Sequence, residues 1–322
     1  MITIDTEETG LWSGQFQSIY NEVDHIRAIH RLQEILDRYD VKPSYLIDYP
    51  IASKKESANI IRVIFERGKC EIGAHMHPWC CPPFSETLTN KNSYFCYLNE
   101  DLQEKKLTSL TEAIKENFGF VPQVFRAGRF GFEERQAKLL RKFGYLVDSS
   151  VRAFSDFSFE EGPDFSCKNC SPYWIEEDNK QDISNKVLEV PVSVGFNRNN
   201  FEFWNNILKK VGTNYFLKKF HMIGILDRLS IVRKIVASPE HEDLERLKNL
   251  AICMEKEGMS VTNIYFHSSS LKPGGSPYVR SEEELEIFLT KIDKYLHFMI
   301  HTLGFKNVTL MGYREKLIKG AK

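Results

Sequence analysis

The stretch that decides the fold is Ile2–Glu8, with the sequence ITIDTEE. Apolar and polar residues alternate in it and then give way to acids, which is typical of a short buried strand with a polar end. A second stretch, Glu71–Trp79, reads EIGAHMHPW and brings two histidines to the end of a similar apolar run. Chemistry in α/β barrel enzymes collects at the carboxyl ends of parallel strands. We therefore expect both stretches to be strands whose ends carry a functional site.

The spacing within these two stretches predicts a metal site. Side chains two residues apart on a strand point to the same face, so His75 and His77 can converge on one ion, and Asp5 and Glu7 share a face in the same way. Imidazole nitrogens and carboxylate oxygens are the ligands of catalytic zinc sites. The alternative is that these histidines are ordinary polar residues at a strand end. The combination of paired acids and paired histidines favours a hydrolytic metal centre.

The composition excludes several classes of protein. The chain has 322 residues, 42% hydrophobic and 27% charged, which suits one large α/β domain or two smaller ones. A net charge of -1 provides no positive field for nucleic acid. No run of about eighteen uncharged apolar residues predicts a membrane span. The N-terminal residues lack a basic segment followed by an apolar one, so we expect a cytoplasmic protein.

The cysteines do not form a recognisable framework. They number seven, and they include one C-x-x-C at Cys167–Cys170 and one adjacent pair at Cys80–Cys81. A structural zinc site needs four such ligands in matched spacing. We therefore expect reduced thiols, as in other proteins of a reducing compartment.

Strand-like and helix-like segments alternate along the rest of the chain. The expected strands are Ile2–Asp5, Pro43–Ile47, Cys70–Ala74, Val124–Arg126, Tyr145–Val147, Val187–Val190, Asn263–His267 and Val308–Leu310. The expected helices are Glu22–Tyr39, Ser57–Arg67, Leu98–Phe118, Phe132–Phe143 and Glu282 to about Leu303. Repeated β-then-α units predict a parallel sheet, closed as a barrel or open and doubly wound.

Two stretches interrupt this alternation. Residues 153–186 are polar and aromatic, and we expect them to form a long loop over the strand ends. Residues 197 to about 257 form a helical insertion, rich in basic and aromatic residues, within a single domain that spans 1–322. This insertion either rests on a membrane through an amphipathic face or packs on the barrel with its lysines in solvent.

Four segments in fixed order resemble the motifs of the polysaccharide deacetylase family, that is, carbohydrate esterase family 4 (NodB homology) and its relatives. They are Thr3–Glu8, Glu71–His77, Phe125–Gly131 and Ile264–His267, and the tail Asn307–Leu310 is similar to the last strand of the family. The pattern is closest to the WalW-like branch found among surface-polysaccharide biosynthesis proteins. The resemblance implies a distorted (β/α) barrel and metal-dependent removal of N-acetyl groups from a glycan or polysaccharide precursor.

The resemblance also implies catalytic roles. Asp5 would be the general base, held ionised and oriented by Arg126. His267 would be the general acid that protonates the departing amine, and Asp148 would orient it. A divalent metal would polarise the carbonyl and lower the pKa of the attacking water.

The metal ligands depart from the family pattern. The opening motif of the family has two adjacent aspartates, the second a ligand, but here Thr6 follows Asp5. We place the ligand at Glu7, with Glu8 as the alternative. The two histidines are two residues apart here and four apart in the family. Zinc is the expected metal, with iron, cobalt, nickel or manganese as alternatives.

Three functions follow from these motifs. The first is hydrolysis of an N-acetylated sugar or glycan. The second is an amidase that acts on a small non-sugar amide or cyclic imide. The third is a non-catalytic glycan-binding protein that lost activity through Thr6. Trp79 and the aromatic residues Phe84, Tyr94, Phe95 and Tyr97 either line a sugar cleft or anchor loops.

Overall fold

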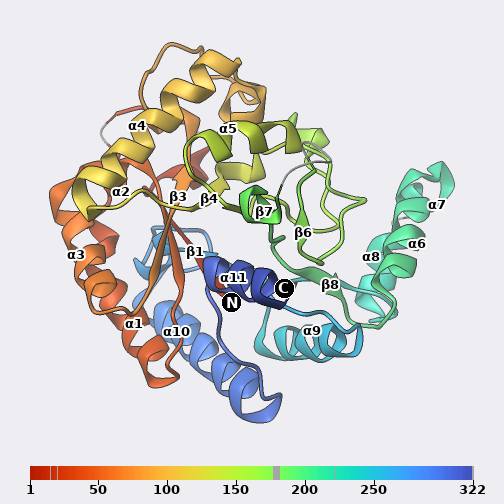
Figure 1. The fold of residues 1–322 in the computed structure, drawn as a ribbon. Coiled ribbons are helices and arrows are strands. Elements are labelled where there is room, and N and C mark those ends of the chain that lie inside the picture. The colour runs from red at the N-terminus through yellow and green to blue at the C-terminus, as the bar shows by residue number, and fades with distance from the viewer. Residues whose placement is uncertain (15, 20, 177–181, 221, 321–322) are drawn as a thin grey trace.

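One curled eight-stranded sheet organises the chain in the computed structural model, which describes residues 1–322 apart from 15, 20, 177–181, 221 and 321–322 (Figure 1). The strand order is β10-β1-β2-β3-β4-β5-β7-β6. The strands are β1 Ile2–Thr6, β2 Ser44–Ile47, β3 Glu71–Met76, β4 Val124–Ala127, β5 Val147–Asp148, β6 Tyr173–Trp174, β7 Leu188–Glu189 and β10 Ile264–His267. All neighbouring strands are parallel except β6, which is antiparallel to β7. The predicted parallel sheet is confirmed.

A small two-stranded sheet lies between the two ends of the large sheet. Its strands are β8 (Val194–Phe196) and β9 (Lys234–Val236), which pair antiparallel. Next to this small sheet, the Ala237 N–H donates to the Ser193 carbonyl at 2.8 Å, and the Tyr265 N–H donates to the Ala237 carbonyl at 3.0 Å. These single bonds join the small sheet to β10. The expected distorted (β/α) barrel is confirmed, with an irregular seam at this point.

Helices cover the outside of the sheet (Figure 1). They are α1 Ile29–Arg38, α2 Tyr49–Ser53, α3 Lys55–Glu66, α4 Glu100–Phe118, α5 Ala137–Lys142, α9 Leu244–Lys256 and α10 Glu282–His297. The last helix, α11 Leu310–Gly320, lies over the centre of the curled sheet and packs against Leu46 and Val124 (Figure 1). The α1 helix shows why the helices form: its apolar side chains recur at helical spacing and are buried against the core. The α4 helix starts where the Asn99 side chain accepts the Leu102 N–H at 2.9 Å, and it ends at Gly119 with φ 80°.

The predicted closing strand at Val308–Leu310 is wrong. Leu310 is the first residue of α11. The Glu71 carboxylate, at the start of β3, accepts the N–H groups of Leu310 at 3.1 Å and Met311 at 3.0 Å. These bonds satisfy two of the free donors at a helix start and place a negative charge there. The contact with Glu71, a residue far away in the chain, therefore stabilises a helix that begins at Leu310.

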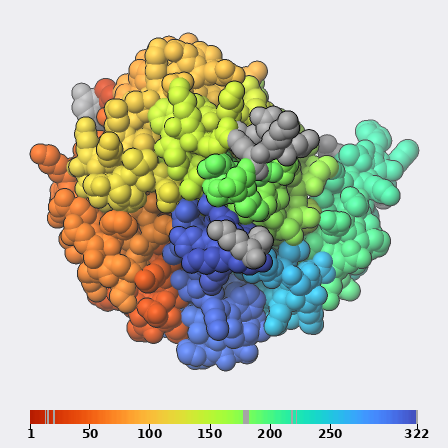
Figure 2. Space-filling view, in the orientation of Figure 1, coloured from red at the N-terminus to blue at the C-terminus, as the bar shows by residue number. Residues whose placement is uncertain are grey.

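The segment from 197 to 257 contains β9, α9 and three further helices. These are α6 (Phe201–Thr213), α7 (Tyr215–Lys219) and α8 (Met222–Arg228). The α9 helix buries its apolar face against the barrel, whereas α6, α7 and α8 form a protrusion on one side of the molecule (Figures 1 and 2). The described part of the preceding segment, 153–186, is mostly irregular and contains the short strand β6 and two short 3-10 helices, Ser158–Glu160 and Ile183–Asn185.

Candidate active site

Adjacent strands bring the sequence motifs to one edge of the sheet. In the parallel register, Asp5 of β1 lies opposite His267 of β10, and His75 of β3 lies opposite Arg126 of β4. Only β2 separates β1 from β3. The motifs are up to about 260 residues apart in the chain, yet their polar ends share the carboxyl edge of the sheet, where barrel enzymes place their chemistry.

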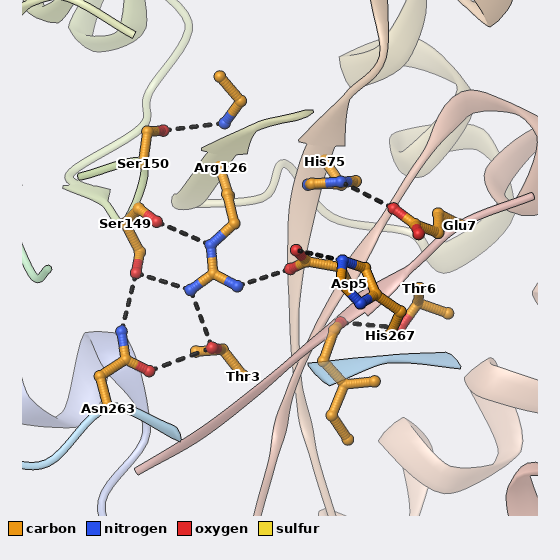
Figure 3. Close-up of polar contacts among 12 residues, drawn as sticks. Thr3, Asp5, Thr6, Glu7, His75, Arg126, Ser149, Ser150, Asn263 and His267 are labelled. Atoms are coloured by element: carbon orange, nitrogen blue, oxygen red, sulfur yellow. Dashed lines mark hydrogen bonds and ion pairs between the residues drawn. The ribbon is translucent and has the colours of Figure 1, made fainter. Parts of the chain in front are cut away.

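Glu7 and the two histidines form a compact buried cluster. The Glu7 Oε2 atom is 3.2 Å from His75 Nε2 and 3.3 Å from His77 Nε2 (Figure 3 shows Glu7 and His75). The ligand atoms of the three residues all lie within 4.8 Å of one another. Glu7 Oε1 and His75 Nδ1 are buried without a hydrogen-bond partner. A buried carboxylate that faces the Nε2 atoms of two imidazoles, with its second oxygen unpartnered, fits a divalent cation with an open coordination position.

Glu8 lies behind this cluster. Its Oε2 atom is 3.0 Å from His77 Nδ1, and its Oε1 atom accepts the Trp79 indole N–H at 2.8 Å. The Glu8 backbone N–H donates to Asp48 at 2.7 Å. A carboxylate on the far nitrogen of a metal-binding histidine fixes the orientation of the ring. Of the two acids that the sequence left open, Glu7 is the one that faces both histidines.

Burial and neighbouring charges set the protonation of these groups. Burial raises the pKa of Glu7, but the charge of His267 and the hydrogen bonds from the two histidines outweigh it and hold that pKa well below its usual range. Burial lowers the pKa of His77, but the adjacent Glu8 charge raises it further than burial lowers it. Burial and the hydrogen bond to Glu8 hold the pKa of Asp48 well above its usual range.

Gly128 makes room for His77. A Cβ atom at this glycine would lie 2.1 Å from His77 Cδ2 and 2.7 Å from His77 Nε2. The two following residues, Arg129 and Phe130, have φ values of 53° and 58°. Such left-handed conformations are uncommon for residues with a side chain and occur often at functional sites. The turn after β4 is thus shaped to fit against the histidine.

Arg126 contacts Asp5 from the side that faces away from His267 (Figure 3). Its Nη1 donates to Asp5 Oδ1 at 2.6 Å, its Nη2 to Thr3 Oγ1 at 2.8 Å, and its Nε to the Ser149 carbonyl at 2.7 Å. The Ser149 hydroxyl also accepts from Asn263 at 3.0 Å. The guanidinium is fully buried, so its charge-assisted bond to Asp5 fixes the carboxylate in one orientation.

His267 faces Asp5 from β10. Its Nε2 is 4.0 Å from Asp5 Oδ2, and its Nδ1 is 2.7 Å from Glu240 Oε2. Burial lowers the pKa of His267, but the negative charges of Glu240 and Glu7 raise it to about 10. The ring is therefore protonated near neutral pH, as a general acid requires.

The prediction that Asp148 orients His267 is wrong. Asp148 lies on β5, and four strands of the sheet lie between β5 and β10. Its carboxylate accepts the Ser150 hydroxyl at 2.6 Å. Burial and the charge of Asp148 raise the pKa of the neighbouring Glu189 well above its usual range. Glu240 takes the place next to His267, and no motif or spacing in the sequence marked it.

A cavity of about 910 Å³ opens over these residues. It is lined by Asp5, Glu7, His75, His77 and His267, together with an aromatic wall made of Trp12, Phe16, Trp79, Tyr94, Phe130, Phe157, Tyr265 and Tyr278. Trp12 packs edge-on against His267, with ring centroids 5.1 Å apart. Of the aromatic residues that the sequence proposed for a cleft, Trp79 and Tyr94 line the cavity, whereas Phe95 belongs to the core.

No protein-family model matches this chain, and no curated protein sequence does. Among solved structures, Puue allantoinase is similar over 96% of this chain and 85% of its own, with 14% identity and a TM-score of 0.51. A probable polysaccharide deacetylase from Pseudomonas aeruginosa PAO1 has 12% identity over 96% of this chain and 86% of its own, with a TM-score of 0.48. The Bc1960 peptidoglycan N-acetylglucosamine deacetylase has 13% identity over 96% and 84%, with a TM-score of 0.46.

Of these three structures, Puue allantoinase has a TM-score above 0.5, and at 14% identity it shows a shared fold. Fold and site together define a (β/α) barrel with a buried cluster of two histidines and one carboxylate. This is the fold that the resemblance of the four motifs to polysaccharide deacetylases predicted.

Proposed function

We propose that the protein is a metal-dependent hydrolase that removes N-acetyl groups from a carbohydrate. One observation carries this proposal: the Glu7–His75–His77 cluster, Asp5 and His267 line one cavity, and buried Arg126 holds Asp5 from behind. Amide hydrolysis requires a polarised carbonyl, a base for the attacking water and an acid for the departing amine. The cavity holds a candidate for each of these requirements.

The roles of the residues follow from their geometry. Glu7, His75 and His77 would hold a divalent ion, with zinc favoured by this ligand set, and the ion when bound supplies carbonyl polarisation and a more acidic water. Asp5 takes the proton of the water, and Arg126 holds the carboxylate in place through its hydrogen bond. His267 lies next to Asp5, with Nε2 4.0 Å from Asp5 Oδ2, and gives its proton to the departing amine.

Two rival functions remain: an amidase that acts on a small amide or imide, and a glycan-binding protein without activity. The site favours hydrolysis of a carbohydrate over both. At about 910 Å³ the cavity lies at the upper end of the range of roughly 300–1,000 Å³ for small-molecule sites, which is more room than a small imide needs. Its aromatic wall offers flat apolar faces for a sugar ring. The argument for lost activity rested on Thr6, but Glu7 provides the carboxylate that Thr6 lacks.

We also propose that α6–α8 contacts an anionic membrane surface. The α6–α8 surface consists of the exposed residues Phe203, Tyr215, Phe216, Phe220, Ile223, Ile225, Leu229 and Ile231, which are 39–74% accessible. Residues 197–234 contain eight lysines and arginines against two acids, in a chain with a net charge of -1. Exposed aromatic residues beside basic ones suit an anionic lipid interface better than packing on the barrel.

Two further observations bear on where the protein acts. No helix in the described part of the chain is long and apolar enough to cross a membrane. All seven cysteines are unpaired, as expected, which supports a reducing compartment such as the cytoplasm. We place the protein there, where precursors of surface polysaccharides are made.

Metal content and acetate release together test the proposed function. Wild-type protein should bind about one divalent ion per chain and release acetate from N-acetylated sugars or short glycans. The His75→Ala/His77→Ala double variant should lose both properties while it keeps the far-UV circular dichroism of the wild type. A wild-type protein that binds no zinc, cobalt, nickel or manganese would overturn the proposal. Metal binding without acetate release on a broad amide and ester panel would favour the glycan-binding alternative.

A further inference from the structure

The cavity contains two arginines with different surroundings. The charge of Arg129 is balanced, since its Nη2 is 2.8 Å from Glu160 Oε2 and its Nη1 donates to Asn90 Oδ1 at 2.7 Å. Arg152 has no such partner. No described residue accepts a hydrogen bond from its guanidinium or forms an ion pair with it, and its Nε atom is buried without a partner. One cation in the cavity is thus left without a counter-charge.

Aromatic rings hold Arg152 in place. Its guanidinium carbon lies 5.8 Å from the ring centroids of Phe130 and Phe157 and 6.0 Å from that of Tyr265. Contact with aromatic faces positions a cation but does not neutralise it. A partly desolvated charge without a partner is unfavourable, so this environment is one that an anion from outside the chain would stabilise.

The acids of the cavity do not serve as that anion. Asp5 is paired with Arg126, Glu160 with Arg129, and Glu7 with the two histidines of the metal cluster. Arg152 therefore remains the one guanidinium of the described cavity lining whose donors are free for a ligand.

Arg152 lies close to the reacting groups. Tyr265 connects them, because its ring centroid is 6.0 Å from the Arg152 guanidinium and 5.8 Å from the ring of His267. A neighbouring histidine, His241, lines the same part of the cavity. Burial and the charge of Arg152 lower the pKa of His241 to about 3, so the ring stays neutral and adds no second cation.

We propose that Arg152 binds an oxyanion of the substrate, a carboxylate or a phosphate, and that the substrate is therefore an acidic N-acetylated carbohydrate. This inference rests on the proposed deacetylase function and names its substrate class. Guanidinium groups bind both kinds of oxyanion through two parallel hydrogen bonds. The two sources, a uronic acid carboxylate and a sugar phosphate, are distinguished by the test.

The test compares kcat/KM for neutral N-acetylglucosamine, N-acetylglucosamine 1-phosphate and an N-acetylated amino-uronic acid. We expect wild-type protein to prefer one of the two acidic substrates, which identifies the anion. In Arg152→Gln the ratio of acidic to neutral kcat/KM should fall about 10- to 100-fold, because a charge-assisted bond is lost. Arg152→Lys should recover part of that ratio. The matched control is Arg38→Gln, which removes an exposed arginine of α1 that does not line the cavity, and the ratio should stay as in the wild type.

An unchanged ratio in Arg152→Gln would overturn the inference and leave the deacetylase function standing. If no substrate is turned over, the proposed function fails, and binding decides the inference by itself. Trp12 and Trp79 line the cavity, so their fluorescence reports on its occupancy. Saturable quenching by inorganic phosphate or glucuronate that is weakened at least tenfold in Arg152→Gln would support an oxyanion site. Equal quenching in the two proteins would overturn it. Thermal melting and metal content show that each variant is folded.

Discussion

His267 lies between Glu240 and Asp5, with Nδ1 2.7 Å from Glu240 Oε2 and Nε2 4.0 Å from Asp5 Oδ2. The other oxygen of Glu240 accepts the backbone N–H of His267 at 3.1 Å. Glu240 therefore holds both the ring and the backbone of the histidine. Because this contact occupies Nδ1, the proton on Nε2 is the one that faces Asp5 and the cavity.

Replacing Glu240 by glutamine should move the alkaline limit of activity. The Glu240 charge helps to raise the pKa of His267 to about 10, so its loss lowers that pKa and the acid form disappears at lower pH. We expect kcat to fall about 10- to 100-fold near pH 9 and the alkaline limb of the pH profile to shift down. The matched control is Glu242→Gln, which changes a glutamate of the same turn that contacts Val236 and Arg246. Equal profiles for the wild type and Glu240→Gln would contradict the positioning role.

The same substitution should change stability in a defined pH window. His267 has a higher pKa folded than unfolded, so its stabilising contribution is complete below about pH 6.5 and is lost as pH rises through about 10. We expect the free energy of unfolding of wild-type protein to decrease across this window more steeply than that of Glu240→Gln. Urea unfolding of the metal-free proteins at several pH values measures the difference. Parallel curves would show that the interaction does not stabilise the fold.

Replacing Glu7 or Glu8, the two acids next to the histidines, by glutamine should separate their roles. Glu7→Gln removes the carboxylate that faces both histidines, so we expect bound metal to be lost. Glu8→Gln alters only the support behind His77, and metal affinity should fall about 10- to 100-fold with the site still formed. Competition with a chelator measures both affinities. A Glu8→Gln variant that loses metal while Glu7→Gln retains it would reverse the assignment.

A methyl group at Gly128 should disturb His77. The Gly128→Ala Cβ would lie 2.1 Å from His77 Cδ2, so the ring must leave the position that it has in the metal cluster. We expect metal affinity to fall at least tenfold with the fold retained, as measured by metal titration and circular dichroism. In the control Gly224→Ala, the added methyl meets nothing within 4 Å. Wild-type affinity in Gly128→Ala would show that the turn after β4 adapts.

Vesicle sedimentation tests the α6–α8 surface. Wild-type protein should bind vesicles with anionic lipid and not neutral ones, and binding should weaken with salt. Phe216→Ser removes a side chain that is 70% exposed on this surface and should reduce binding. The control Ile287→Ser removes a side chain that is 58% exposed on α10, away from this surface, and should leave binding unchanged. Equal effects of the two changes would exclude a specific membrane face.

Much of the fold could be predicted from local pattern. Alternation marked the strands β1 and β3, helical spacing marked α1 and α10, and Gly119 marked the end of α4. Each of these signals acts over a few residues, because side-chain direction and backbone conformation are local properties. The prediction of a strand at Val308–Leu310 was wrong because Glu71, a residue more than two hundred positions away, caps a helix that begins at Leu310. The local pattern gives no sign of this contact.

The sequence by itself determined which side chains could converge within one strand, and His75 and His77 are the example, since a two-residue spacing places both on one face. Only the tertiary structure decided which residues meet across strands. It placed Glu240 rather than Asp148 against His267, turned Glu7 toward the histidines and Glu8 behind them, and left Arg152 without a counter-charge. The physical reason is that such pairings depend on strand order and on loops that pack over the sheet, and neither is encoded in local spacing.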